Sequence, residues 1–467
     1  MVSENKNFLM NVAYQLLSYV FPLVTVSYVS QCLGVTNIGT YSYTYSTVYL
    51  FMLLGMLGIN NYGNREIARV RDDKQACSFI FFSIYKLQLL TVGLASIGYV
   101  IYIQCIVSEY EKLFWLQAIY LFSAFLDVNW FYFGLEKFKL TITRNCIIKV
   151  ASLILILFFV RTEADLAQYT VIMAGSTFLS QLYLILILHR YIVNVHTTLH
   201  DSLHHLRGCC ILFIPVLAFG IYRVMDKTML GAMATVTELG YYENAERLIN
   251  IPISIINALG TVMLPRMSYL LKNHSVESTK AIYASMKLAL LLSCMMAAGI
   301  FLVSNDIVVV LFGYDFYKSG EIIRILSITI LASAWANVIR TQYLIPSGKD
   351  TIYVISTIGG AVVNLLLNIV LIPKYGAYGA CLGTIAAEYF VMIYQTVKVR
   401  RVLEIKRYFN LAWKDLVISC GIILFSYEVG NFFSDIYVRL LVNIFIAIVL
   451  FGTINYKYIV HEFLGKR

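Results

Sequence analysis

The chain has 467 residues, of which 60% are hydrophobic and only 13% are charged, and its mean hydropathy is +0.75. Soluble proteins carry about a quarter charged residues, so this composition excludes a soluble globular protein and indicates an integral membrane protein. The formal charge of +10 does not indicate nucleic-acid binding, because most Lys and Arg residues lie in short loops between apolar runs.

Apolar runs long enough to cross a bilayer as a helix, about 20 residues each, recur along the chain. We expect an all-α polytopic membrane protein with about 14 transmembrane helices. The first run is too long for the apolar part of a signal peptide, so we expect it to be a span. The expected spans are residues 8–30, 40–62, 79–104, 113–134, 142–160, 166–188, 209–231, 241–264, 281–303, 321–345, 352–372, 377–397, 411–430 and 436–456.

Basic residues gather in alternate loops, after the second, fourth and twelfth expected spans. These loops hold Arg65, Arg69, Arg71, Lys74, Lys137, Lys139, Arg144, Lys398, Arg400, Arg401, Lys406, Arg407 and Lys414. Cytoplasmic loops carry the excess of Lys and Arg, so we expect both termini in the cytoplasm.

Between the sixth and seventh spans, residues 191–208 show apolar positions at helical spacing and predict an amphipathic linker helix on the cytoplasmic surface. His196, His200 and His204 fall on one face of that helix. Only Asp201 accompanies them as a further ligand type, and the nine cysteines are scattered without CxxC spacing. We therefore expect no metal site.

The two halves of the chain show an internal repeat. An offset of 201 residues separates Lys86 from Lys287, Gly39 from Gly240 and Arg65 from Arg266, and similar offsets relate Leu57-Gly58 to Leu259-Gly260 and Lys139 to Lys349. Because six is an even number of spans, a repeated six-helix unit has both copies in the same orientation, a parallel repeat. The expected parts are a six-helix lobe at 1–190, the linker helix at 191–208, a second six-helix lobe at 209–400, and two additional helices at 401–467.

The stretch from Pro215 to Ser268 places charges inside apolar spans. Arg223, Asp226 and Lys227 lie within the first of its spans. Each charge at membrane depth costs about 2.5 to 3.5 kcal/mol, so a lipid-facing position is unfavourable and an interior or water-filled position is expected. In the next span a polar stripe at helical spacing comprises Arg247, Asn250, Ser254 and Asn257.

Further ionisable residues fall in or near apolar runs, namely Lys86, Asp127, Lys287, Arg340 and Glu388. Such residues are candidates for function, although an interhelical ion pair or a side chain reaching to the interface fits each of them as well. The cationic members outnumber the acidic ones, which favours an anionic substrate. No phosphate-binding GxxxxGK[ST] loop and no HExxH or GxSxG motif occurs, so we expect a transporter without a cofactor or catalytic residues rather than an enzyme.

Several long segments resemble a known family of transporters. They are IYRVMDKTMLG, GYYENAERLINIP and ALGTVMLPRMS within residues 221–268, DVNWFYFGLEKFKLTITRN at 127–145 and VVNLLLNIVLIPKYGAYGA at 362–380. They resemble the Wzx-type oligosaccharide flippases of O-antigen and capsule assembly, in the multidrug/oligosaccharidyl-lipid/polysaccharide exporter superfamily. The resemblance covers essentially the whole chain.

The resemblance implies two six-helix lobes around a cationic cavity in a bacterial cell membrane. It implies a flippase that moves undecaprenyl-diphosphate-linked oligosaccharide units from the cytoplasmic to the outer leaflet, coupled to an ion gradient. The expected headgroup-binding cations are Lys86, Arg223, Lys227, Lys287 and Arg340, and the candidates for an ion-coupling or ion-pairing role are Asp226, Glu388 and Asp127. Membrane lipids, a polysaccharide polymerase and a chain-length regulator are the further expected partners. A multidrug or cation exporter of the same superfamily, a membrane-bound polymerase and a scaffold protein are the alternatives.

Overall fold

The structure is a computed structural model that describes residues 2–273 and 275–456. Side chains are described from residue 23 onward, except those at 215, 218, 219, 222, 223, 272, 273, 275 and 276. Within these residues all regular structure is helical, which confirms the expected all-α fold. Helices satisfy their backbone hydrogen bonds within one segment, as the lipid interior requires.

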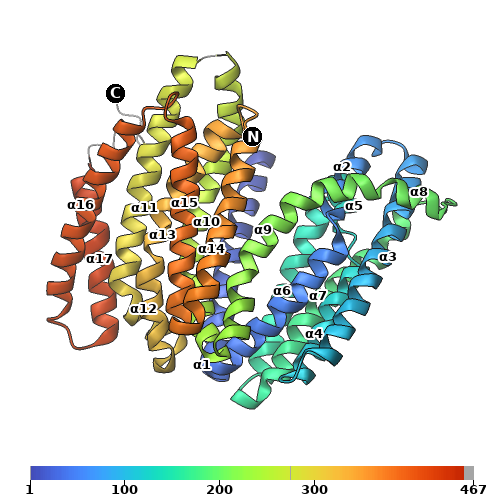
Figure 1. The fold of residues 1–467 in the computed structure, drawn as a ribbon, viewed down its shortest axis with the longest axis horizontal. Coiled ribbons are helices and arrows are strands. Elements are labelled where there is room, and N and C mark those ends of the chain that lie inside the picture. Colours follow the sequence, from blue (N-terminus) through green and yellow to red (C-terminus); the bar gives the residue numbers. More distant parts are fainter. Residues whose placement is uncertain (1, 274, 457–467) are drawn as a thin grey trace. The chain divides into compact units, whose positions relative to one another are not determined.

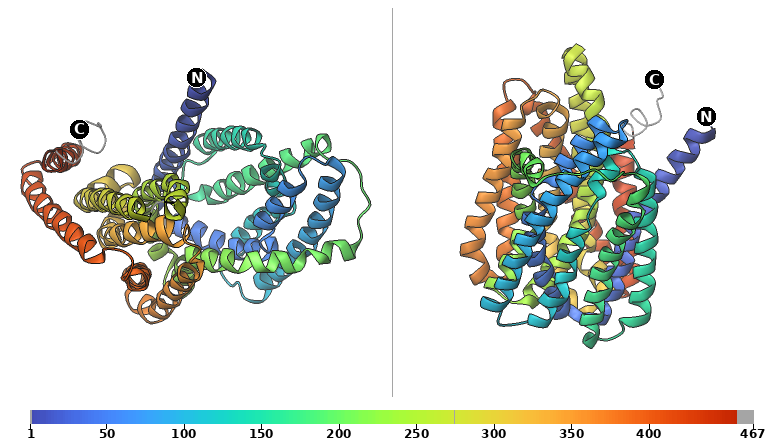
Figure 2. Two further views of the ribbon diagram at one scale, coloured as in Figure 1. Left: turned by 90° about the horizontal axis from the view of Figure 1, so that it is seen from above. Right: turned by 90° about the vertical axis from the view of Figure 1, so that its right-hand side faces the viewer.

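The chain divides into two compact units, Met1–Gly231 and Ala232–Arg467. The helices of the first unit are α1 (Val2–Met56), α2 (Ile59–Val70), α3 (Lys74–Cys105), α4 (Glu111–Phe125), α5 (Asn129–Gly134), α6 (Phe138–Phe159), η1 (Glu163–Asp165), α7 (Leu166–Ile187), η2 (Leu188–Arg190), α8 (Leu199–His204) and α9 (Leu206–Met233). Those of the second are α10 (Val236–Asn273), α11 (Ser275–Phe312), η3 (Tyr314–Phe316), α12 (Tyr317–Leu326), α13 (Ile328–Ile339), the π-helical turn η4 (Arg340–Leu344), α14 (Asp350–Tyr375), α15 (Ala377–Val399), α16 (Ile405–Gly430) and α17 (Ile436–Ile454). Within each unit the long helices run alongside one another as a bundle (Figures 1 and 2).

The described residues contain ten helices long and apolar enough to cross a membrane, or eleven if the bent pair Tyr314–Leu326 and Ile328–Leu344 forms one span. The expected number of about 14 is therefore not confirmed. One reason is that the expected span 113–134 is divided into α4 and α5. The side chain of Asp127, between these helices, accepts the backbone N–H of Asn129 at 3.0 Å and so supports the start of α5.

Gly34 interrupts the long helix α1, which covers the first expected span and most of the second. Its φ of 74° and ψ of 173° are not helical, and a positive φ of this size strains any residue with a Cβ. The side chain of Asn37 fixes the break by donating from Nδ2 to the carbonyl of Glu163 at 2.9 Å. A break in the backbone therefore replaces the longer loop expected between the first two spans.

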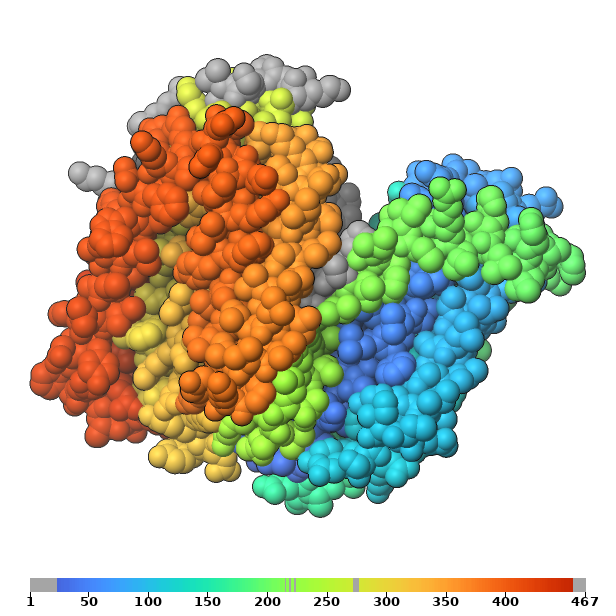
Figure 3. Space-filling view, viewed as in Figure 1, coloured from blue at the N-terminus to red at the C-terminus, as the bar shows by residue number. Residues whose placement is uncertain are grey.

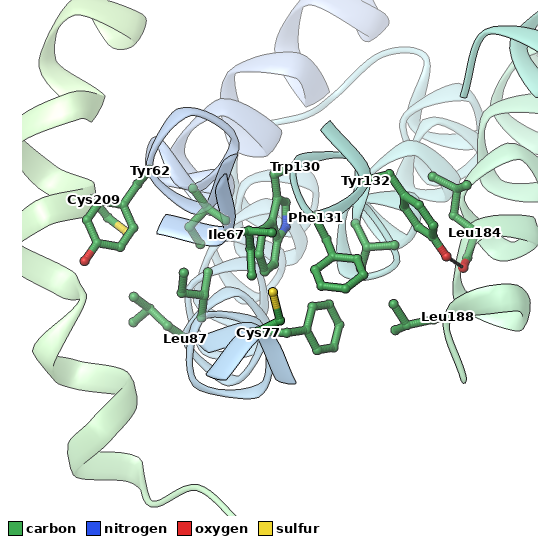
Figure 4. Close-up of a cluster of buried hydrophobic side chains, with 14 residues drawn as sticks. Tyr62, Ile67, Cys77, Leu87, Trp130, Phe131, Tyr132, Leu184, Leu188 and Cys209 are labelled. Atoms are coloured by element: carbon green, nitrogen blue, oxygen red, sulfur yellow. Dashed lines mark hydrogen bonds between the residues drawn. The ribbon is translucent and has the colours of Figure 1, made fainter. Parts of the chain in front are cut away.

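An aromatic cluster anchors one end of the first unit (Figure 4). The rings of Phe81 and Trp130 are stacked with centroids 5.5 Å apart, and both side chains are buried. The indole Nε1 of Trp130 donates to Oε1 of Gln88 at 3.0 Å, and the hydroxyl of Tyr132 donates to the carbonyl of Leu184 at 2.8 Å. Polar atoms of the buried aromatic residues thus find partners, and α3, α5 and α7 are held together.

In the second unit, α16 and α17 pack on α11 (Figure 1). Ala298, Ile422, Ala447 and Phe451 form a buried cluster among these three helices. Buried Tyr408, near the start of α16, lies against Trp335 of α13 with ring centroids 6.2 Å apart. The outward face of the C-terminal pair is visible in the space-filling view, in red (Figure 3).

The linker between α7 and α9 is less helical than expected. A helix occupies only Leu199–His204 within 191–208 before α9 starts at Leu206, and 192–198 has no regular structure. The run of β-branched and short polar residues before Thr198 disfavours a helix. A capping box then starts α8, because Thr198 and Asp201 bond to each other's backbone N–H groups. Helix α9, expected to open the second lobe, lies almost entirely within the first compact unit.

Candidate functional site

The polar stripe predicted on the eighth span lies on α10. Asn250 and Asn257 are exposed, and Arg247 and Ser254 are half-buried. Nε of Arg247 donates to Oε1 of Glu243 at 2.8 Å, one turn away, and Glu243 is buried. The stripe therefore presents amide groups and a hydroxyl, with the charge of its Arg balanced by a neighbouring carboxylate.

Arg340 joins this stripe from another helix. It is the first residue of the π-helical turn η4, which directly follows α13. Its Nη2 lies 3.5 Å from Oδ1 of Asn257, and its guanidinium carbon lies 5.6 Å from the ring centre of Tyr353 on α14. The cation thus lies over an aromatic face beside an exposed amide, and its contacts with the described residues leave most of its donors for a ligand.

Asn257 is also held by Asn337 of α13, whose Nδ2 donates to Oδ1 of Asn257 at 2.7 Å. Glycine at 260 permits this close approach of α10 to α13. A Cβ added at Gly260 would lie 2.4 Å from Oδ1 of Asn337 and 2.9 Å from Oγ1 of Thr341. The position of Arg340 relative to the stripe therefore depends on a residue without a side chain.

Gln342 lies in the same π-helical turn and is fully buried. Neither its Oε1 nor its Nε2 has a hydrogen-bond partner among the described residues. An unsatisfied buried amide costs about 1 to 3 kcal/mol, and π-helical turns inside α-helices occur frequently at functional sites. The π-helical backbone and the unsatisfied amide of Gln342 make this end of α13 a candidate site on grounds independent of charge.

Glu388, a candidate for ion coupling, is held by α13 as well. Oγ of Ser333 donates to Oε2 of Glu388 at 2.7 Å. Ser333 precedes Arg340 by seven residues, a rise of about 10 Å along the helix. Glu388 therefore lies about two turns along α13 from the Arg340 position, in the same unit but not in contact with it.

The structure places Lys287 elsewhere in the second unit. It lines a pocket with residues of α16 and α17, among them Lys414 and Asp415. Lys287 thus lines this pocket, whereas Arg340 lies beside Asn257 of α10, and a binding surface that both share stays a prediction.

Lys86, the repeat partner of Lys287, binds the linker. Its Nζ donates to the carbonyl of Thr197 at 2.5 Å, just before the capping box of α8. Hydrogen bonds from the backbone N–H and the hydroxyl of Thr198 lower the pKa of the Asp201 carboxyl. Farther along, Nδ1 of His205 lies 2.9 Å from the hydroxyl of Tyr62, and burial lowers the pKa of its imidazole.

Asp127 belongs to a polar network in the first unit. Its Oδ1 accepts from Nδ2 of Asn129 at 2.7 Å, and Oδ1 of Asn129 accepts from Nη2 of Arg144 at 3.0 Å. Nη1 of Arg144 donates to the carbonyl of Ser180 at 3.0 Å. Arg144 is 6% exposed inside α6, whereas the sequence placed it in a basic loop. The network gives Asp127 structural partners on α5 and α6.

Three of the predicted residues lie on α9. Asp226 is buried and Lys227 is half-buried, and both take part in further polar or electrostatic contacts within the described residues. The side chain of Arg223 lies outside the described residues. Neither Asp226 nor Lys227 is fully exposed, and their place in a charged cavity stays a prediction.

Sequence reasoning missed Gln342, Asn337 and Arg144. A Gln or Asn within an apolar run gives a weak signal, because such residues commonly form interhelical hydrogen bonds. Arg144 lies among Lys137 and Lys139, so charge counting assigned it to a loop. The expected span 142–160 already contains Arg144, so the apolar residues that follow it did predict a helical position, and only its burial was missed.

Comparison with known proteins gives concordant results. The model of a family described as polysaccharide biosynthesis protein matches residues 5–271. A Shigella dysenteriae protein that carries the name O-antigen transporter is 24% identical, with 82% of this chain and 96% of that protein covered. A protein of Escherichia coli K12 with the same name is 22% identical, with 82% of this chain and 93% of that protein covered.

The fold has counterparts among solved structures. The lipid II flippase MurJ in an inward closed conformation superimposes with a TM-score of 0.78, 15% identity, and coverage of 97% of this chain and 100% of that chain. An inward-facing MATE family multidrug resistance transporter of the MOP superfamily gives a TM-score of 0.63 and 16% identity, with 84% of this chain and 94% of that chain covered. The fold is thus that of MurJ and the MATE transporters.

Proposed function

Since the chain belongs to the family of polysaccharide biosynthesis proteins, we propose that it is a Wzx-type flippase that moves lipid-linked oligosaccharides across a bacterial cell membrane. The observation that carries this proposal is the near full-length match to two relatives named as O-antigen transporters, at 96% and 93% of their lengths. The chain is on this view a transporter of the MOP superfamily and not an enzyme.

The headgroup that such a substrate presents is anionic, and its passage through a membrane has a large electrostatic cost. Moving an isolated ionised group into a low-dielectric medium costs tens of kcal/mol unless it is paired. A guanidinium such as that of Arg340 offers two parallel donors to a phosphate. The exposed amides of Asn250 and Asn257 extend the same surface with donors and acceptors suited to phosphate or sugar oxygens.

We assign the proposed headgroup site to the surface formed by α10 and the π-helical turn, with Arg340 as its cation. Lys227 and Arg223 of α9 remain proposed contributors. Lys86 of α3 instead donates to a linker carbonyl, and Lys287 of α11 lines the pocket beside α16. Glu388 is the proposed coupling residue, because its carboxylate is half-buried and accepts a hydrogen bond from Ser333. Asp226 is the second candidate for the coupling residue. Asp127 is proposed to have an ion-pairing role within its polar network.

The finer features of the function follow from the same proposal. The substrate is an undecaprenyl-diphosphate-linked repeat unit, carried from the cytoplasmic to the outer leaflet by alternating access coupled to an ion gradient. Both termini are in the cytoplasm, as the basic loops predict. A polysaccharide polymerase and a chain-length regulator are the proposed partners.

A MATE-type exporter of cations is the weaker alternative, since it would require acidic residues where Arg340 lies.

The test is a transport measurement in cells that lack the protein. Lipid-linked repeat units should accumulate in the cytoplasmic leaflet. A membrane-impermeant glycosidase added to spheroplasts cannot reach them there, and the wild-type gene should restore their cleavage. The Arg340→Ala variant should restore it at least tenfold less well, because a hydrogen bond to a charged group contributes about 1.5 to 3 kcal/mol. Arg340→Lys should retain part of the activity.

The surface variant Lys406→Ala, on the exposed start of α16, serves as the control and should complement fully. Two results would count against the proposal. Normal glycosidase access in cells without the protein would exclude the flippase function. Full activity of Arg340→Ala at wild-type abundance would exclude Arg340 from the headgroup site.

A further inference from the structure

A pocket of about 390 Å³ lies in the second unit where the C-terminal helices α16 and α17 meet α11. Its polar lining comes from all three helices and includes Lys287 of α11, Lys414 and Asp415 of α16, and Asn455 just after α17. None of these residues belongs to the surface of Arg340 and Asn257. The pocket is thus separate from the proposed headgroup site.

The charges of the pocket favour an anion. Two ammonium groups, those of Lys287 and Lys414, accompany one carboxylate, that of Asp415. Lys414 is exposed and Lys287 is half-buried, whereas Asp415 is 7% exposed. Among the described lining residues the cationic groups therefore outnumber the carboxylate, and the most exposed of these charges is the ammonium group of Lys414.

The surroundings of the pocket indicate that it lies where the helices leave the membrane. Helix α17 ends at Ile454, which lines the pocket together with Tyr456. Trp413 is 71% exposed beside Lys414, and Tyr456 is 63% exposed. Trp and Tyr at such exposed positions are typical of the membrane-water interface, where lipid headgroups lie.

We propose that this pocket binds the phosphate headgroup of an anionic membrane phospholipid. Lys287 and Lys414 donate to the phosphate oxygens, Asn455 contacts the polar part of the headgroup, and the apolar side chains of Leu291 and Leu411 contact the first methylenes. The carboxylate of Asp415 opposes binding through charge repulsion. A bound lipid joins α11 to the C-terminal pair.

The opposite end of α17 has a protein-only connection of the same kind. Nε of Arg439 donates to Oδ2 of Asp306 on α11 at 2.8 Å, and the second guanidinium nitrogen binds the other carboxylate oxygen. Arg439 and Asn455 are about 24 Å apart along a helix of this length. The hairpin is thus held on α11 by a guanidinium-carboxylate pair at one end and, on this proposal, by a lipid phosphate at the other.

The proposal is tested on the purified full-length protein in neutral detergent by native mass spectrometry, with dioleoylphosphatidylglycerol added in increasing amounts. Lys287→Ala and Lys414→Ala should each weaken binding about fivefold, since each Lys near an anionic lipid surface contributes roughly 1 kcal/mol. Asp415→Asn should tighten binding. Lys280→Ala on α11 and Lys406→Ala on α16 are matched controls, because both residues are exposed outside the pocket, and they should bind as the wild type does.

Three comparisons decide the identity of the ligand. Dioleoylphosphatidylcholine, which has the phosphate but no net charge, should bind more weakly than dioleoylphosphatidylglycerol, and equal binding of the two lipids would overturn the proposal. Inorganic pyrophosphate should not displace the lipid; displacement with the same Lys dependence would indicate a site for soluble anions and overturn the proposal. Competition by a lipid-linked oligosaccharide would make the pocket a substrate site and overturn it as well.

If both Lys variants bound phosphatidylglycerol as tightly as the wild type does, the proposal would also be overturned. Lys287→Gln replaces Lys287→Ala if the latter is not recovered as a folded monodisperse protein. Lipid binding and transport are tested separately. If the pocket binds only a membrane lipid, Lys414→Ala should bind phosphatidylglycerol more weakly and still transport the lipid-linked substrate at the wild-type rate in detergent-free vesicles of phosphatidylcholine.

Discussion

At the scale of single residues, the candidate site depends on uncharged amides and on a glycine as much as on the charge of Arg340. Asn257 receives both the amide of Asn337 and the guanidinium of Arg340 on one oxygen, at 2.7 and 3.5 Å. This arrangement requires α10 and α13 to approach closely at Gly260. A cation fixed in this way is pre-organised, so less conformational entropy is lost when it binds an anion.

Gly260→Ala tests the close approach. The added Cβ meets Oδ1 of Asn337 at 2.4 Å, a contact that forces a side chain or a helix to move. We expect a loss of about 1 to 3 kcal/mol of stability, measured by thermal or denaturant unfolding in detergent, together with reduced transport.

Gly299→Ala on α11 is the matched control. A Cβ at this position meets nothing within 4 Å, and Ala is the better helix former by about 1 kcal/mol. The control should therefore be as stable as the wild type or more so. Equal stability of the two variants would show that α10 and α13 have room at Gly260.

The sequence predicted the types of residue at the site better than their grouping. Arg340, Asn257 and Glu388 were identified because polar groups in apolar runs stand out. Their grouping depends on which helices adjoin, and a repeat offset of 201 suggested that Lys86 and Lys287 would be equivalent. The structure gives them different partners, a linker carbonyl and a pocket beside α16, because equivalent sequence positions in a repeat need not keep equivalent neighbours.

At the scale of elements, hydrophobic runs predicted the helices but not their interruptions. The break at Gly34, the division of α4 from α5 and the π-helical turn η4 each result from one or a few residues with special backbone geometry. Hydropathy averaged over a span does not detect such positions. The linker was predicted as one helix from its apolar spacing, but the propensities of residues 192–198 and the Thr198 cap restrict the helix to α8.

The linker also carries a titratable contact outside the membrane spans. Burial, with a smaller contribution from His204, lowers the pKa of His205 below its usual value of 6.5. The folded state therefore favours the neutral imidazole, and the stabilising contribution is present above pH 6.5 and falls as the pH is lowered through the folded pKa. We expect His205→Gln, which remains neutral, to lose less thermal stability than the wild type between pH 7.5 and pH 5.

His200→Gln is the control for this measurement, since His200 lies on the exposed side of the same linker. It should follow the wild-type dependence on pH. If His205→Gln and the wild type lose stability in parallel, the contact of His205 with Tyr62 does not respond to protonation.

At the scale of the whole molecule, composition alone identified the class of protein, and the long resembling segments identified the family. The family match and the MurJ-like fold bear these out. The detailed count of spans did not follow, because α4 is only 15 residues long and α12 and α13 form a bent pair. A criterion based on the length of one straight helix does not count a span that consists of two shorter helices.

The boundary between the two compact units has a genetic consequence. It falls at Gly231 and Ala232, two residues before α9 ends at Met233, and residues 234 and 235 separate α9 from α10. Most contacts are therefore made between residues on the same side of a short connection. Two separate genes, encoding residues 1–234 and 235–467, should restore transport when co-expressed, whereas neither should do so alone. Glycosidase access in spheroplasts measures the outcome, and inactivity of two stably inserted halves would show that covalent continuity at this connection is itself required.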